Sequence, residues 1–182
     1  MAIIFEMWVE CGTEADGAKI VAHFDGLKTQ LLTGRAVTWG AAPLMPCPTA
    51  IVVASSDLSR SGVRTLQDAL EATESGLRLY HHLQRGPSFR FARVAWEAES
   101  IPMAELGDYT KDYGPGDKHL LLECAMDEAL YRDIGSPRNC YPFREGFRWT
   151  RYSGETYQPL YSNDAEALNE CCRSLFPEYF KY

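Results

Sequence analysis

The sequence lacks the short motifs that mark metal, redox or α/β-hydrolase sites. Its 182 residues contain no Cys-x-x-Cys, no His-Glu-x-x-His and no Gly-x-Ser-x-Gly pattern. Such motifs bring metal ligands or an activated serine together within a short stretch of chain, so a local catalytic centre has nothing to build on. We therefore expect no metal and no cofactor, and a catalytic site would have to combine residues far apart in the sequence.

Basic residues are also scarce. The chain has 18 Lys and Arg residues against 25 Asp and Glu residues, which gives a formal net charge of −7. Binding to phosphate backbones depends on neutralisation by Lys and Arg, so this balance argues against a nucleic-acid-binding protein. An acidic chain gains solubility from its charge and would favour a basic partner.

Long hydrophobic runs and a regular cysteine framework are missing too. The apolar N-terminal segment has no basic residues before it, and Glu6 and Glu10 interrupt it, so we expect neither a signal peptide nor a membrane span. The six cysteines are irregularly spaced and include the adjacent pair Cys171 and Cys172, which makes a poor disulfide framework. These features together predict a cytoplasmic protein with reduced thiols.

What the chain does have is a globular composition and clear local patterns. Apolar residues make up 46% and charged residues 24% of the sequence, as in an ordinary folded domain. From Ile3 to Cys11, apolar residues recur with the period of two expected of a strand. Thr13, with Asp16 three residues later, is typical of a helix N-cap, and Gly26 is placed to end that helix.

Two further strands and a loop are predicted next. Residues 27–32 and 36–40 flank a Thr-Gly-Arg turn and predict a strand pair. A loop is expected around Pro43, Pro46 and Pro48, because proline interrupts strand hydrogen bonding. Residues 49–55 are β-branched and continuously apolar, which predicts a central strand covered on both faces.

The longest helix is expected to follow this strand. Ser59 or Ser61 is predicted to begin it, and Gly86 in the left-handed conformation, followed by Pro87, is predicted to end it. Its apolar stripe keeps the helical period. The stripe consists of Val63, Leu66, Leu70, Leu77 and Tyr80.

A strand over residues 89–97 closes the first half of the chain. Phe89 and Phe91 lie on one parity of this strand, whereas Val94 and Trp96 lie on the other, so we expect a β-bulge. The order strand, helix, strand pair, strand, helix, strand predicts an α+β fold. We interpret residues 1–99 as a ferredoxin-like split βαβ core, with a mostly antiparallel sheet, helices on one face and an inserted hairpin.

The second half is predicted to extend this core. Residues 100–118 are polar and rich in turn residues, which indicates a connecting loop. Residues 119–182 predict a C-terminal α+β extension packed with the core as one compact domain. It would contain a strand over 119–126, a short helix over 127–134, a hairpin of 147–152 with 156–161, and a final helix that begins at Asn163 or Asp164 and ends at Pro177.

Residues 12–19 resemble a phosphate-binding P-loop, because they follow a strand and open a helix. The chemistry does not fit. Lys19 comes one residue late, Ile20 stands where a magnesium-binding Ser or Thr is needed, and Glu14 would repel a phosphate. We interpret the segment as an ordinary capped helix start.

His119 and Glu123 are the best acid/base candidates in the sequence. On a helix they would be neighbours, whereas on a strand they would be too far apart to hydrogen-bond. The alternating pattern around them favours a strand, so the sequence favours a structural role for both residues over a catalytic one.

The stretch 138–161 is net positive and aromatic in an otherwise acidic chain. Tyr, Trp and Arg dominate the energetics of protein interfaces, because each buries a large area while keeping a polar group. The alternative is that the aromatic rings complete the core and the arginines cover them from the surface. The candidate binding residues are Arg148, Trp149, Arg151, Tyr152 and Tyr157.

Three hypotheses for function follow. The first, which we favour, is a non-enzymatic protein-binding module of the accessory or immunity type, which uses this aromatic and arginine-rich surface. The alternative is a small-molecule-binding or enzymatic domain, with a pocket assembled from His119, Glu123 and Arg148 or Arg151. The third is a self-associating protein that forms a homodimer through its sheet. None of them involves nucleic acid or a membrane.

Overall fold

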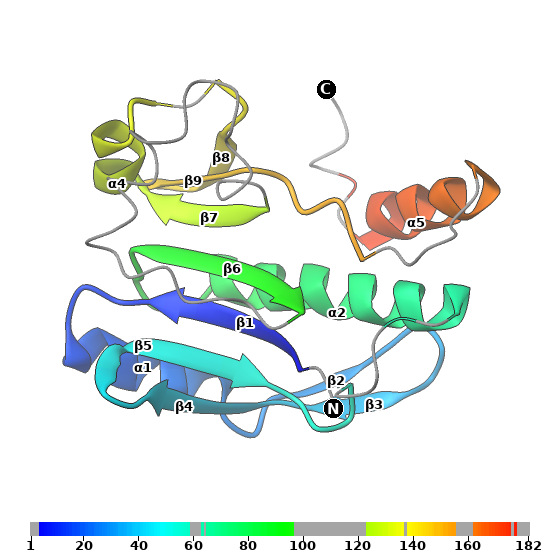
Figure 1. The fold of residues 1–182 in the computed structure, drawn as a ribbon, viewed down its shortest axis with the longest axis horizontal. Helices are drawn as coiled ribbons and strands as arrows, with labels where there is room; N and C mark the ends of the chain where they lie inside the picture. Colours follow the sequence, from blue (N-terminus) through cyan, green and yellow to red (C-terminus); the bar gives the residue numbers. More distant parts are fainter. Residues whose placement is uncertain are drawn as a thin grey trace.

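Figure 1 shows the fold in a computed structural model of the chain. The structure describes residues 4–58, 63, 65–96, 123–136, 138–155, 162–175 and 177. Several predictions fall outside these residues, namely the loop over 100–118, the strand over 156–161, the acid/base candidate His119 and the binding candidate Tyr157.

A seven-stranded sheet forms the centre of the molecule, with the strand order β4-β5-β1-β6-β7-β9-β8 (Figure 1). Every neighbouring pair in it is antiparallel, so the protein is of the α+β class. The sheet is larger than expected, because β7, β8 and β9 continue the sheet of the first half. Its strands are β1 (Phe5–Glu10), β4 (Gly40–Leu44), β5 (Cys47–Ala54), β6 (Phe91–Trp96), β7 (Cys124–Asp127), β8 (Tyr141–Arg144) and β9 (Phe147–Trp149).

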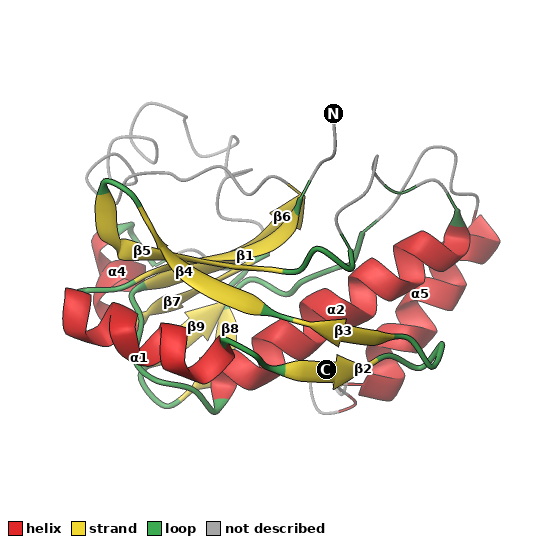
Figure 2. Cartoon of the chain, turned by 90° about the horizontal axis from the view of Figure 1, so that it is seen from below, coloured by secondary structure: helices red, strands yellow, loops and turns green. Residues whose placement is uncertain are grey.

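A separate two-stranded sheet and four described helices complete the fold. The small sheet pairs β2 (Lys28–Gln30) with β3 (Ala36–Thr38), as predicted for these segments. The helices are α1 (Glu14–Phe24), α2 (Leu66–Gln84), α4 (Glu128–Asp133) and α5 (Ser162–Leu175). Figure 2 shows α1 and α2 on the same face of the large sheet, and α5 packs against α2.

The first strand and helix confirm their predictions. Phe5, Met7 and Val9 are fully buried in the main core, because alternate side chains of a strand share one face. The side chain of Thr13 accepts a hydrogen bond from the backbone N–H of Asp16 at 3.1 Å. This bond satisfies one of the free N–H groups at the start of α1.

Strand β6 is buried on both faces, which explains the change of parity in its sequence. Ala92 and Val94 belong to the main core, whereas Phe91 packs on the opposite face with Met126 and Leu130. Its register with β1 runs without a shift from Trp96 to Phe91, so the predicted bulge is wrong. Because Leu130 lies on α4, this helix covers the opposite face, and the expectation of helices on one face holds only for α1 and α2.

Helix α2 begins and ends differently from the prediction. Its N-cap is Thr65, which forms a reciprocal capping box with Asp68, rather than Ser59 or Ser61. The helix ends at Gln84, and Gly86 is not among the glycines with positive φ. A Cβ atom at Gly86 would lie 3.1 Å from Nε2 of His23, so close packing, not a left-handed turn, favours glycine there.

The carbonyl groups at the end of α2 bind an arginine from another part of the chain. The guanidinium group of Arg144 donates from Nη1 to the backbone oxygen of Gly86 at 2.6 Å and from Nη2 to that of Pro87 at 2.8 Å. It also lies 4.2 Å from the ring centroid of Phe147. A cation stabilises the negative end of a helix dipole, and here it also joins β8 to α2.

The C-terminal hairpin has different partners from those predicted. Strand β9 pairs with β8 across a turn at Glu145 and Gly146, and with β7 on its other side. The predicted pairing of 147–152 with 156–161 is therefore wrong for β9. Glu123 has φ +60° and precedes β7, so it lies in a turn, not on the predicted strand.

The predicted proline loop is confirmed only at Pro46, which lies in the turn between β4 and β5. It is wrong for Pro43, which lies in β4, and for Pro48, which lies in β5. Strand β4 forms an edge of the sheet, where proline is tolerated. The final helix α5 starts at Ser162, so Asn163 and Asp164 lie within its first turn and neither residue is its N-cap.

Both edges of the large sheet are obstructed. On β4 the backbone N–H of Ala41 donates to the carboxylate of Asp25 at 3.3 Å, and Pro43 has no N–H group. On β8 the carbonyl oxygen of Phe143 accepts from the side chain of Gln84 at 2.7 Å. These contacts use backbone groups that an edge strand would otherwise offer to another chain, and dimerisation through the sheet stays a prediction.

The first testable prediction concerns Gly76 on α2. A Cβ atom there would lie 2.6 Å from the ring of Tyr152, which is 1% exposed and packed in the core. We expect Gly76→Ala to lower the free energy of unfolding by about 1–3 kcal/mol in urea titrations, although alanine favours helix. Gly40→Ala is the control, because its nearest atom is 3.9 Å away, and an equal loss there would contradict the steric explanation.

Candidate functional site

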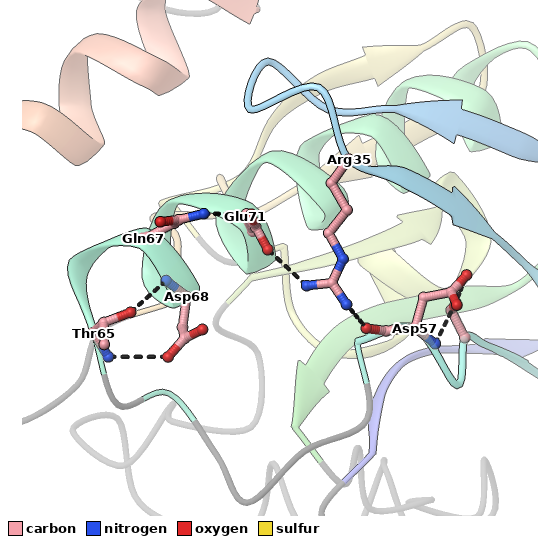
Figure 3. Close-up of polar contacts among 7 residues, drawn as sticks. Arg35, Asp57, Thr65, Gln67, Asp68 and Glu71 are labelled. Carbon is pink, nitrogen blue, oxygen red and sulfur yellow. Dashed lines mark hydrogen bonds and ion pairs between the residues drawn. The ribbon is translucent and has the colours of Figure 1, made fainter.

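A polar hollow of about 600 Å³ lies between the β2–β3 turn and the start of α2. Figure 3 shows its main polar contacts. We call it the Arg35–Glu71 hollow. Its lining consists of Thr33, Gly34, Arg35, Thr65, Gln67, Asp68 and Glu71.

Local sequence signals position both walls of the hollow. On one side, Gly34 has φ +83°, a conformation that glycine adopts without strain. The resulting turn bonds the N–H of Leu31 to the carbonyl oxygen of Arg35 at 2.8 Å, which places the Arg35 side chain beside α2. On the other side, the capping box of Thr65 and Asp68 fixes the first turn of the helix.

An ion pair forms the floor of the hollow (Figure 3). Nη1 of Arg35 lies 2.8 Å from Oε2 of Glu71, and Nη2 donates to the backbone oxygen of Asp57. Gln67 donates from Nε2 to the second oxygen of Glu71 at 3.1 Å. Both charged groups are thus held in one orientation before any ligand arrives, which lowers the entropic cost of binding.

Electrostatics make the hollow negative. Burial acts to raise the pKa of Glu71, but hydrogen bonds from Gln67, Arg35 and Thr33 outweigh it and lower that pKa. Glu71 is therefore ionised at neutral pH, although it is only 5% exposed. With Asp68, the lining carries two carboxylates against the single guanidinium of Arg35.

A second buried carboxylate, one turn further along α2, fixes the β2–β3 hairpin. Glu74 is 2% exposed, and its two oxygens accept from the backbone N–H of Leu32 at 2.8 and 3.0 Å. Arg78 pairs with the same carboxylate at 2.6 Å. Hydrogen bonds to buried charges are strong, so this contact makes the wall of the hollow rigid.

The aromatic candidates from the sequence lie mainly in the core. Trp149 and Tyr152 are 3% and 1% exposed, and their ring centroids lie 5.6 and 5.8 Å from that of Tyr80. They therefore pack in the interior and do not form an exposed binding face themselves. This placement agrees with the alternative that the aromatic rings complete the core.

The arginine candidates are partly exposed and contact tyrosines. Arg148 pairs with Glu128 at 2.6 Å, and its guanidinium lies 5.5 Å from the ring centroid of Tyr131. The guanidinium of Arg151 lies 4.0 Å from the ring centroid of Tyr141, which is 41% exposed. Among the described binding candidates, these stacked pairs form the part of the predicted aromatic and arginine-rich surface that is partly exposed.

The alternative pocket, from His119, Glu123 and Arg148 or Arg151, stays a prediction, because His119 lies outside the described residues. Glu123 lies just before β7, where its side chain accepts from the backbone N–H of Ser153 at 3.0 Å and its carbonyl oxygen accepts from Tyr80. Arg148 contacts Glu128, just after the end of the same strand. Glu123 and Arg148 thus stand at opposite ends of β7.

The residues of the hollow were missed in the sequence, although one signal was present. Thr65 followed three residues later by Asp68 is the pattern of a capping box, and it would have placed the helix start correctly. Nothing local shows that Arg35 pairs with Glu71, because 36 residues separate them.

Comparison of the chain with protein-family models, curated proteins and solved structures finds no match. Within the described ranges, no group of three or more His, Cys, Asp and Glu residues is placed to hold a metal ion. None of the described helices is both long and apolar enough to cross a membrane. The geometry of the hollow and its surroundings is therefore the basis on which a function can be assigned.

The second prediction tests the floor of the hollow. Arg35→Gln leaves the buried Glu71 carboxylate without its cation, so we expect the free energy of unfolding at pH 7 to fall by about 2–3 kcal/mol. Because folding lowers the pKa of Glu71 from its ordinary value of 4.5, ionised Glu71 stabilises the fold at pH values above 4.5. This stabilisation is lost as the pH falls through the folded-state pKa. The difference between variant and wild type should therefore shrink below about pH 4 in urea titrations.

The control for this prediction is Arg132→Gln. Arg132 is 75% exposed and lies 3.7 Å from Glu128, so its loss should change stability by less than about 0.5 kcal/mol. Equal losses in the two variants, or a loss in Arg35→Gln that does not depend on pH, would show that the ion pair is not the cause.

Proposed function

We propose that the chain is a non-enzymatic protein-binding module, of the accessory or immunity type, that binds its partner through the Arg35–Glu71 hollow. The observation that carries this proposal is the polar, negative and pre-ordered lining of the hollow. A basic side chain of a partner would lie between the carboxylates of Asp68 and Glu71 and form charge-assisted hydrogen bonds with them.

The lining favours a protein partner over a small molecule. Pockets for small molecules are lined predominantly by apolar and aromatic side chains. The hollow is lined by polar and charged side chains and one glycine, which is closer to the polar part of a protein interface. The overall charge of −7 would also attract a basic partner over long range.

The second candidate surface is the aromatic and arginine-rich one predicted from the sequence. The stacked pairs Arg148 with Tyr131 and Arg151 with Tyr141 combine arginine and tyrosine, which are frequent in interface hot spots. Unlike the hollow, this surface presents cations, which would suit an acidic partner rather than a basic one.

The scaffold itself does not select a function. We infer that β1, β4, β5 and β6 with α1 and α2 form a ferredoxin-like split βαβ core, and the strand order β4-β5-β1-β6 supports this inference. Such scaffolds carry many unrelated functions, so the proposal rests on the site alone.

The third prediction uses a lysine to fill the hollow. Gln67 is exposed at its rim and bonds to Glu71, so the ammonium group of Gln67→Lys would occupy the position proposed for the partner's basic side chain. In native mass spectrometry of the full chain purified from its own host, we expect wild type to retain one basic protein. We expect Gln67→Lys to reduce the bound fraction by about tenfold or more, which corresponds to about 1.4 kcal/mol.

Asn139→Lys provides the matched control, because it adds the same charge at an exposed turn position that is not part of the lining of the hollow. It should retain the partner within about twofold of wild type. Retention by Gln67→Lys with loss in Arg148→Gln or Arg151→Gln would move the binding surface to the stacked pairs. A retained small molecule in place of a protein would favour the alternative, a small-molecule-binding domain.

A further inference from the structure

Residues 150–155 leave β9 and cross to α2, and we call this segment the strap. It starts at a firm attachment to β7. The backbone N–H of Thr150 donates to the carbonyl oxygen of Cys124 at 2.8 Å. In return, the backbone N–H of Cys124 donates to Oγ1 of Thr150 at 2.9 Å. The rest of the strap depends on contacts with other elements.

Three contacts seat the strap on α2. The ring of Tyr152 packs directly over Gly76. Gly154, with φ +99°, lies so close to Thr73 that a Cβ atom would be 2.8 Å from its methyl group. The backbone N–H of Glu155 donates to Oγ1 of Thr73 at 2.9 Å. The strap thus packs closely against a buried helix, and a small shift of the strap would break several of these contacts together.

Two carboxyl groups meet at this seat. Tyr152 donates its hydroxyl hydrogen to Oε1 of Glu155 at 2.8 Å. Glu123, from the turn before β7, accepts from both the backbone N–H and the hydroxyl of Ser153. One carboxyl group therefore bonds to Tyr152 and the other to Ser153, both on the strap. The charge of Glu123 also acts on the carboxyl group of Glu155.

Within the described part of the chain, the groups that act on Glu155 come from several elements. They are Thr73 on α2, Tyr152 on the strap, Glu123 before β7 and Arg93 on β6. Burial is the largest effect, and it raises the pKa of Glu155 to about 7, with the charge of Glu123 acting in the same direction. The hydrogen bond from Tyr152 and the charge of Arg93 act in the opposite direction and are outweighed.

We propose that Glu155 is a proton-controlled latch that holds the strap on α2 when its carboxyl group is neutral and weakens this hold when it is ionised. The latch is independent of the Arg35–Glu71 hollow and of its partner. Ionisation would place a second negative charge beside Glu123 in a partly buried position, where charge is costly. The neutral acid keeps the hydrogen bond with Tyr152 without that cost.

The sign of the pH dependence follows from the two pKa values. The ordinary value for this carboxyl group is 4.5, and the docked value is about 7. Between these limits the docked strap binds more protons than the released strap, so docking weakens as the pH rises through this window. Above about pH 7 both forms are ionised and the dependence ends.

The test is amide hydrogen exchange of the full chain, followed by NMR between about pH 5 and pH 8 and corrected for the intrinsic rate. For the backbone amides of Ser153 and Glu155, we expect protection to fall on the order of 30- to 100-fold across this range. The amide of Trp39, which bonds to the carbonyl oxygen of Leu27 in the β2–β3 region, is the internal control and should change by less than about twofold.

Two variants separate the latch from a merely structural contact. Glu155→Gln imitates the neutral acid, so protection of the Ser153 amide should stay constant across the range. Glu123→Gln keeps the acceptor for Ser153 and removes one charge, so the fall should end at a lower pH. Constant protection in wild type, or an unchanged fall in Glu155→Gln, would overturn the proposal.

A direct titration covers the case in which Glu155→Gln does not fold. The carboxyl carbon of Glu155 in the wild-type chain should titrate by NMR with a midpoint near 7. A midpoint near the ordinary value of 4.5 would refute the latch, because a carboxyl group with that midpoint is ionised throughout the window.

Discussion

Helix α2 is buried on several sides, and its polar side chains must therefore find partners on other segments of the chain. Glu71, Thr73 and Glu74 are all at most 5% exposed, and an unpaired polar group at such a position is strongly destabilising. Each of them is satisfied by a distant segment, through Arg35, the backbone of Glu155 and the backbone of Leu32 respectively. The packing of these segments thus depends on the polar face of one helix.

The same constraint places the chemically interesting groups. The Arg35–Glu71 hollow forms where the first turns of α2 reach the surface, and the strap crosses the helix at Thr73 and Gly76. At the far end, Arg144 donates to carbonyl groups in the last turn of the helix and just beyond it. A rigid helix holds these features at fixed distances from one another, and such rigidity keeps a binding site pre-ordered.

Much of the first half was predictable, because its signals act over a few residues. The alternation in β1, the cap at Thr13 and the positive φ of Gly26 all appear as the sequence indicates. The hairpin was not predictable in the same way. The residues of β9 have a strand pattern that suits a partner on either side, and the pairing with β8 depends on the turn at Gly146 and on Phe143 packing against Trp149.

The sequence by itself determined the α+β class, the first strand and helix, the small β2–β3 pair and the acidic charge. Periodicity and caps depend on residues close together in the chain, and net charge depends only on composition. Only the tertiary structure decided that Trp149 is a core residue, that Arg35 pairs with Glu71 and that the strap is seated on Thr73. The reason is distance along the chain: the last two contacts join residues 36 and 82 positions apart. The free energy of such contacts depends on burial and on the surrounding groups, which no local pattern contains.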